Sequence, residues 1–157
     1  MDQKRPKGSE QPDIVKETLQ EHRGCMTVVS EVETCLDQQP DREGKWLARL
    51  CATLPRLAST LRAHFQIEQE GPLYSKLPLA FPRFAHRLEQ LESEHARILE
   101  TVDSVVARTH ELRDAQVYEM RELNGRVQLL IATIRRHEAE ENEIVIQAHW
   151  DEVGVGD

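Results

Sequence analysis

The feature that most constrains the fold of this chain is a repeat of histidine and glutamate residues at a constant offset of 73 positions. Each half of the repeat has a lone histidine and, 42 positions later, the first residue of a His-x-x-x-Glu segment. The residues are His22, His64 and Glu68 in the first half, and His95, His137 and Glu141 in the second. Because residues four apart share one face of a helix, the pattern predicts two helical hairpins that bring four imidazoles and two carboxylates together.

Apolar residues recur with helical spacing over four segments, and turn residues separate these segments. We expect helices over about 13–39, 45–69, 82–110 and 114–151, with Asp13 capping the first and a kink at Pro55 in the second. Residues 40–44 are predicted to form a turn, and the proline-rich stretch 71–82 a loop. The expected fold is therefore all-α, an up-down-up-down antiparallel four-helix bundle over residues 13–151, with a disordered tail at 1–12 and a frayed tail at 152–157.

The midpoints between successive histidines can be compared with the predicted turns, which provides a check on this topology. Residue 43, inside the first predicted turn, is equidistant from His22 and His64. Residue 116, beside the third turn, is equidistant from His95 and His137, and the midpoint between the two halves falls in the 71–82 loop. Antiparallel neighbours joined at these turns place all four histidines at one height in the bundle.

Composition excludes several classes of function. The formal net charge of −8 disfavours nucleic-acid binding, because an acidic surface repels phosphate. No apolar run approaches the roughly 18 residues of a membrane span, and the first residues lack the apolar core of a secretory signal, so we expect a cytoplasmic protein without a membrane partner. Three cysteines without a Cys-x-x-Cys pair argue against a disulfide framework and a zinc–thiolate site.

All six repeated residues fall on the apolar stripes of their helices, where burial of an unpaired carboxylate costs several kcal/mol. Two cations would offset this charge, and the two glutamates could bridge them. Nitrogen and oxygen donors without thiolate suit iron best, with manganese and zinc as the alternatives. Apolar neighbours are expected to exclude water from the centre; they are Leu61, Leu91, Ile98, Ile134 and Ile144.

The doubled motif resembles that of the hemerythrin-like (HHE cation-binding) domains over about residues 13–150. The segments that carry the resemblance are Glu21-His22, His64 to Glu70, Glu94-His95 and His137 to Glu143. The resemblance implies a non-haem centre of two iron ions with a bridging oxo or hydroxo group. By the same resemblance, His22, His64, His95 and His137 are terminal ligands, and Glu68 and Glu141 are bridging carboxylates.

One departure from the oxygen-carrying hemerythrins is the lack of their fifth histidine on the third helix, where Leu91 and Leu99 stand one turn either side of His95. Glu138 and Glu92 are the candidates for a replacement ligand. The sequence leaves the roles of two further residues undecided. Cys25 is either core filler or a redox-sensitive thiol, and Tyr74 either gates the site or anchors a helix end.

The expected function is binding of O2 or a related small oxidant, or sensing of iron or oxygen. The departure from the fifth histidine weighs against simple reversible O2 carriage. Alternatives are an enzyme, a di-iron peroxidase or oxidase, and a module that binds a protein partner according to iron status. No acid–base residue beyond the ligands is evident, so the enzyme ranks second.

Overall fold

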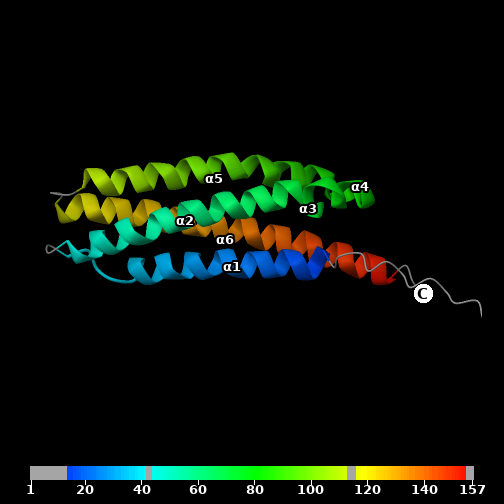
Figure 1. The fold of residues 1–157 in the computed structure, drawn as a ribbon, viewed down its shortest axis with the longest axis horizontal. Coiled ribbons are helices and arrows are strands. Elements are labelled where there is room, and N and C mark those ends of the chain that lie inside the picture. Colours follow the sequence, from blue (N-terminus) through cyan, green and yellow to red (C-terminus); the bar gives the residue numbers. More distant parts are fainter. Residues whose placement is uncertain (1–13, 42–43, 113–115, 155–157) are drawn as a thin grey trace, which may run out of the picture.

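The computed structural model describes residues 14–41, 44–112 and 116–154. These residues form four long helices and no strand, and the helices run antiparallel to their neighbours along one common axis (Figure 1). The helices are α1 (Ile14–Leu36), α2 (Lys45–Glu70), α5 (Ala85–Glu111) and α6 (Val117–Gly154). The predicted all-α bundle is confirmed. The predictions for the tail at 1–12 and for the Asp13 cap lie outside the described residues.

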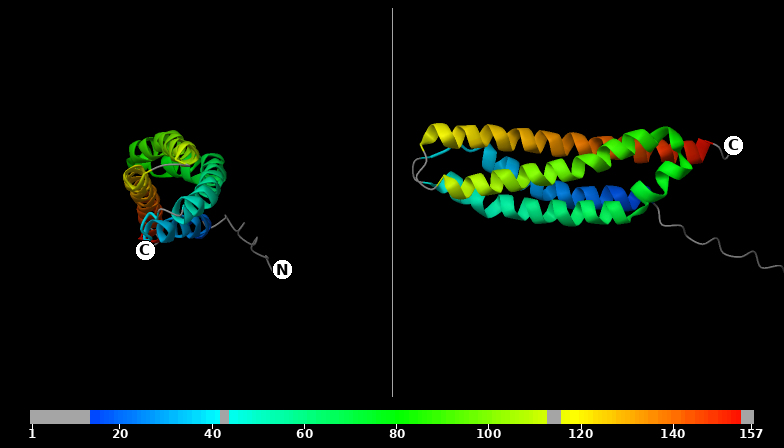
Figure 2. Two further views of the ribbon diagram at one scale, coloured as in Figure 1. Left: turned by 90° about the vertical axis from the view of Figure 1, so that its left-hand side faces the viewer. Right: turned by 90° about the horizontal axis from the view of Figure 1, so that it is seen from above.

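Each long helix packs mainly against two others. The main contacts join α1 to α2 and α6, and α5 to the same two helices. Viewed along the axis, the four helices therefore surround a central core (Figure 2). None of the helices in the described ranges combines the length and apolar character needed to cross a membrane.

The core consists of two apolar clusters. The larger lies toward the α1–α2 turn and includes Val29, Leu54 and Ile134, and the smaller lies toward the 71–84 corner and includes Leu88 and Ile144. The five apolar residues expected to shield the centre are all buried in one or the other cluster. Along α6, the interval between Ile134 and Ile144 holds the predicted ligands, so the polar site interrupts the apolar core.

The stretch between α2 and α5 differs from the loop that was expected. It contains two single-turn helices, α3 (Pro72–Ser75) and α4 (Leu77–Ala80), followed by a 3-10 turn, η1 (Pro82–Phe84). A proline stands in the first two positions of each, where its missing N–H costs no helical hydrogen bond. Leu73, Leu77 and Phe84 are buried, so this corner closes one end of the bundle.

Helix boundaries differ from the predicted ones by a few residues. α1 ends at Leu36 rather than about 39, and α6 continues to Gly154, so part of the predicted frayed tail at 152–157 is helical. At the start of α2, the Asp41 carboxylate accepts hydrogen bonds from the backbone N–H groups of Lys45 and Trp46 at 2.9 and 3.0 Å. Gly44 precedes this helix with φ of 77°, a value that favours glycine. α2 runs unbroken through Pro55; the predicted kink there stays a prediction.

Candidate metal centre

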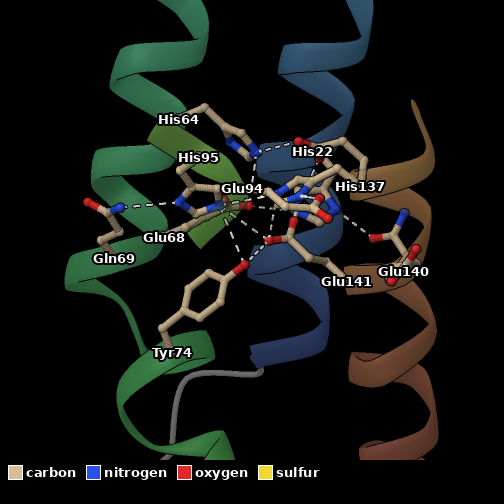
Figure 3. A network of polar contacts seen from close by, with 12 residues as sticks. His22, His64, Glu68, Gln69, Tyr74, Glu94, His95, His137, Glu140 and Glu141 are labelled. Carbon is tan, nitrogen blue, oxygen red and sulfur yellow. Dashed lines mark hydrogen bonds and ion pairs between the residues drawn. The ribbon is translucent and has the colours of Figure 1, made fainter. Parts of the chain in front are cut away.

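The structure brings all six repeated residues to one level of the bundle, with their side chains pointing inward (Figure 3). α1 contributes His22, α2 His64 and Glu68, α5 His95, and α6 His137 and Glu141. None of the six is more than 6% exposed. Four helices therefore supply one buried polar cluster, as the 73-residue repeat predicts.

The cluster divides into two overlapping sets of potential ligands, each with donor atoms within 4.8 Å of one another. The first set contains His22, His64, Glu68, Glu138 and Glu141. The second set contains Glu68, His95, His137 and Glu141. Only Glu68 and Glu141 belong to both.

Glu68 directs one oxygen toward each set. Its Oε1 lies 2.8 Å from Nε2 of His22 and 2.9 Å from Nε2 of His64, and its Oε2 lies 3.4 Å from Nε2 of His95. Glu141 also directs one oxygen toward each set, with the two oxygens exchanged. Its Oε2 lies 3.2 Å from Nε2 of His22 in the first set, and its Oε1 lies 3.1 Å from Nε2 of His137 in the second. Both carboxylates thus have the orientation that a bridge between two ions requires.

Glu138 is a third buried carboxylate, only 2% exposed, and it belongs to the first set alone. Its Oε1 lies 3.0 Å from Nε2 of His64, and its Oε2 3.3 Å from Nε2 of His22. Glu92, the other candidate for a replacement ligand, is exposed on α5. The structure therefore favours Glu138, and it adds a donor to the set of His22 and His64 rather than to that of His95.

Nε2 of every histidine faces the centre, and a partner at Nδ1 holds the ring of three of them; Nδ1 of His64 is buried without a hydrogen bond. Nδ1 of His22 donates to Oδ1 of Asn142 at 2.6 Å, and Nδ1 of His137 donates to Glu94 at 3.1 Å. These bonds place the proton on Nδ1, which leaves the Nε2 lone pair for a metal. The side-chain amide of Gln69 contacts Nδ1 of His95 at 3.2 Å.

In the absence of a cation, the carboxylates favour the protonated forms of His22 and His64. Burial lowers the pKa of His22, but hydrogen bonds to Glu141 and Glu68 outweigh it and raise that pKa to about 11. Burial also lowers the pKa of His64, but hydrogen bonds to Glu138 and Glu68 outweigh this effect and raise that pKa to about 10. Burial favours the neutral form of Glu141, yet its hydrogen bonds with His137 and His22 hold its pKa well below the usual range.

Protons alone leave this cluster poorly satisfied. Nε2 of His22 lies within 3.3 Å of three carboxylates, but it can donate only one hydrogen. Although imidazole nitrogens lie nearby, Oε2 of Glu68, Glu138 and Glu141 all lack a hydrogen bond. Nε2 of His95 and Nε2 of His137 also face each other at 3.1 Å. Cations between these atoms would pair with several of them at once, so the donor set fits two metal ions.

The sequence of residues 13–148 matches the family described as hemerythrin HHE cation binding domain. The chain belongs to this family. The match covers most of the chain and all six repeated residues. Searches of curated proteins and of solved structures found no match.

Several residues of this HHE domain were missed from the sequence although the same 73-residue offset marks two of them. Gln69 follows Glu68 and contacts His95 of the other hairpin, while Asn142 follows Glu141 and contacts His22. The two contacts are therefore equivalent under the repeat.

The repeat is broken at the residue that follows the histidine of each His-x-x-x-Glu segment. This residue is Glu138 on α6 but Phe65 on α2. The Phe65 ring stacks on His95 with centroids 4.0 Å apart and planes inclined by 6°. At equivalent positions of the HHE site, α6 thus contributes a carboxylate and α2 an aromatic ring.

Tyr74 of α3 reaches the second ligand set (Figure 3). Its hydroxyl donates to Oε1 of Glu141 and lies 3.5 Å from Nε2 of His95. Burial and the nearby carboxylates, first Glu141, raise the pKa of Tyr74 well above its ordinary value, so the phenol is protonated in the metal-free site. These contacts place Tyr74 at the site, and the two roles considered for it, gating of access and anchoring of a helix end, stay predictions.

Cys25 lies in the larger apolar cluster and is 2% exposed. Burial, followed by the charge of Glu138, raises the pKa of its thiol well above the ordinary value. Because the thiolate is the reactive form, this environment favours core filler over a redox-sensitive thiol.

Proposed function

We propose that this HHE domain holds two iron ions and uses them to bind O2 or a related small oxidant, or to sense iron or oxygen. The observation that carries the proposal is the pair of carboxylates that each direct one oxygen to each ligand set. In this arrangement Glu68 and Glu141 would be shared by the two ions. His22, His64 and Glu138 would hold one ion, and His95 and His137 would hold the other.

The two ions would differ in openness. The first set offers five protein side chains and the second offers four. An ion in the second set has more room for an outside ligand, and the Tyr74 hydroxyl stands beside it as a hydrogen-bond donor. We therefore assign the small-molecule site to the ion bound by His95 and His137.

The donor types support iron over the alternatives. Both sets consist of imidazole nitrogens and carboxylate oxygens, and neither includes a thiolate, although three cysteines are present in the chain. Structural zinc sites more often contain cysteine, and magnesium and calcium prefer oxygen donors alone. Manganese shares the preferences of iron and is the nearest competitor.

Metal analysis together with an optical spectrum tests the proposal. Protein purified in air should contain about two iron ions per chain, as expected for two ligand sets, and show the charge-transfer absorption of ferric iron. His64→Ala and Glu141→Ala should lose most of that iron, while His86→Ala, which changes an exposed histidine on α5, should keep it. Full iron occupancy in the first two variants would refute the assignment.

A second candidate is a di-iron peroxidase or oxidase. The position of Tyr74 favours it, because a protonated phenol at the site could donate a hydrogen bond to a bound substrate. Consumption of peroxide with a reducing co-substrate, at a rate that Tyr74→Phe reduces, would identify an enzyme. Binding of O2 or azide without turnover would favour the binding or sensing function.

A further inference from the structure

A cavity of about 280 Å³ lies between α1 and the corner where α2 meets α3. We call it the acidic portal. α1 lines it with Glu17 and Glu21, α2 with Ile67 and Glu68, and the corner with Gly71 and Leu73. Glu17 and Glu21 are exposed, whereas Glu68 is 6% exposed and belongs to both ligand sets. One wall of the cavity therefore faces solvent and another contains a proposed metal ligand.

The acidic portal is electrostatically suited to cations. Three carboxylates line it, and none of the described residues that line it is basic. Oε2 of the buried Glu68 makes no hydrogen bond, although Nε2 of His95 lies 3.4 Å away, so this oxygen could accept a cation. Six water molecules occupy about 180 Å³ at liquid density, so the volume admits a hydrated divalent ion.

The cavity between α5 and α6 offers a contrasting approach to the same site. It is about 330 Å³ in volume and is lined by Glu94, which bonds to His137, and by three arginines, Arg97, Arg126 and Arg136. Arg136 already pairs with Glu94 at 2.8 Å. The positive charge here opposes entry of a cation.

We infer that divalent metal ions reach the centre through the acidic portal, where Glu17 and Glu21 attract the ion and Glu68 receives it. This inference rests on the proposed metal-binding function, and it assigns a role to two carboxylates outside either ligand set. An attractive field at a cleft raises the rate of association more than the final affinity. The portal residues should therefore control the rate of metal uptake.

The test compares the uptake of Co²⁺ by the metal-free protein, followed through visible absorption in a stopped-flow instrument. The double variant E17Q/E21Q should take up the ion at least about threefold more slowly at low salt, as expected when steering charge is removed. Its final Co²⁺ content should equal that of the wild type. The difference should shrink at 0.5 M salt, where charges are screened beyond roughly 4–5 Å.

The matched control is E89Q/E92Q, which removes two exposed carboxylates from α5 and so changes the net charge equally. It should load at the wild-type rate. Equal rates for E17Q/E21Q and the wild type, or equal slowing in the control, would overturn the portal. A reduced final Co²⁺ content in E17Q/E21Q would also overturn it, because the two residues would then be ligands. Failure of the wild type to bind Co²⁺ or iron would instead refute the proposed function.

Discussion

Phe65 and Glu138 occupy equivalent positions in the two hairpins, yet they have opposite chemistry. Glu138 adds a negative charge beside His22 and His64, whereas Phe65 covers His95 with an apolar ring. This one difference makes the two ligand sets unequal. A symmetric site would offer two similar sets of donors, whereas here the first set offers one more protein donor than the second, which lies beside Tyr74.

Replacement of Glu138 by glutamine tests its role as a ligand. Glu138→Gln keeps the shape of the side chain but removes its charge, so the ion in the first set should bind at least about tenfold more weakly. Iron content after dialysis against a mild chelator should fall from two ions toward one. The control is Glu92→Gln on the exposed face of α5. Equal retention in both variants would show that Glu138 is not a ligand.

Tyr74→Phe tests the contribution of the phenol that bonds to Glu141. Loss of a hydrogen bond to a ligand usually lowers metal affinity about 10–100-fold. We expect faster iron loss to a chelator, together with weaker azide binding to the ferric protein. Tyr118→Phe, at a tyrosine that is 75% exposed on α6, is the matched control. An unchanged azide affinity in Tyr74→Phe would mean that small molecules do not bind beside the phenol.

At the residue scale, the six proposed ligands could be predicted from their helical periodicity, whereas the residues that contact these ligands could not. His22 and the other five repeated residues stand at helical spacing, and two of them, Glu68 and Glu141, are buried acids, so their convergence could be inferred. Gln69 and Asn142 also repeat, and the offset could have revealed them. Tyr74 and Phe65 have no counterparts of the same type in the other half, so only the three-dimensional structure reveals their contacts with His95.

At the scale of elements, the segment that joins the two hairpins has two roles. α3 presents Tyr74 to the metal centre and forms one wall of the acidic portal, while the buried side chains of Leu73 and Leu77 fasten the segment to the bundle. Its three prolines made it look like a loop in the sequence. Short helices of one turn leave no apolar periodicity to detect, which explains why α3 and α4 were not predicted.

Pro55→Ala tests the cost of a proline inside α2. Pro55 is exposed and lies within the helix, so its replacement loses no core packing and restores a backbone donor. We expect the free energy of unfolding to rise by about 1–3 kcal/mol, measured by urea denaturation. Pro82→Ala, at the first residue of η1, should bring no such gain. Unchanged stability in Pro55→Ala would show that α2 adapts to the proline without cost.

At the scale of the whole molecule, the metal centre and the apolar core depend on each other. The polar cluster lies between the two apolar clusters, so every long helix carries a buried polar side chain within its packing surface. If the metal ions bind only the folded chain, at 100 times the dissociation constant each contributes about 2.7 kcal/mol. Removal of both ions by chelation should therefore lower the melting temperature by roughly 11–22 °C, measured by calorimetry. No change on chelation would contradict a structural role for the ions.

The pH dependence of stability should reverse when the metal is removed. In the metal-free protein, the pKa values of His22 and His64 are raised to about 11 and about 10, above the 6.5 expected on unfolding. Their contribution is complete below pH 6.5 and is lost as pH rises toward those values. Metal binding competes with these protons, so the loaded protein should gain stability over the same interval.

Urea denaturation at pH 6.0, 7.25 and 8.5 checks this reversal in the range where thiol, phenol and lysine groups contribute little. The free energy of unfolding should fall across the series for the chelated protein and rise for the loaded one. Parallel pH profiles for both forms would contradict the competition between protons and metal at the histidines.

The order of the ligands along the chain has a consequence for biosynthesis. Each ligand set combines Glu68 from the first hairpin with Glu141 in the C-terminal half of α6. A nascent polypeptide on the ribosome therefore cannot assemble either set until translation has passed Glu141. Bound metal would thus distinguish chains translated past Glu141 from shorter ones, which retain His22, His64 and Glu68 but lack a carboxylate common to both ligand sets.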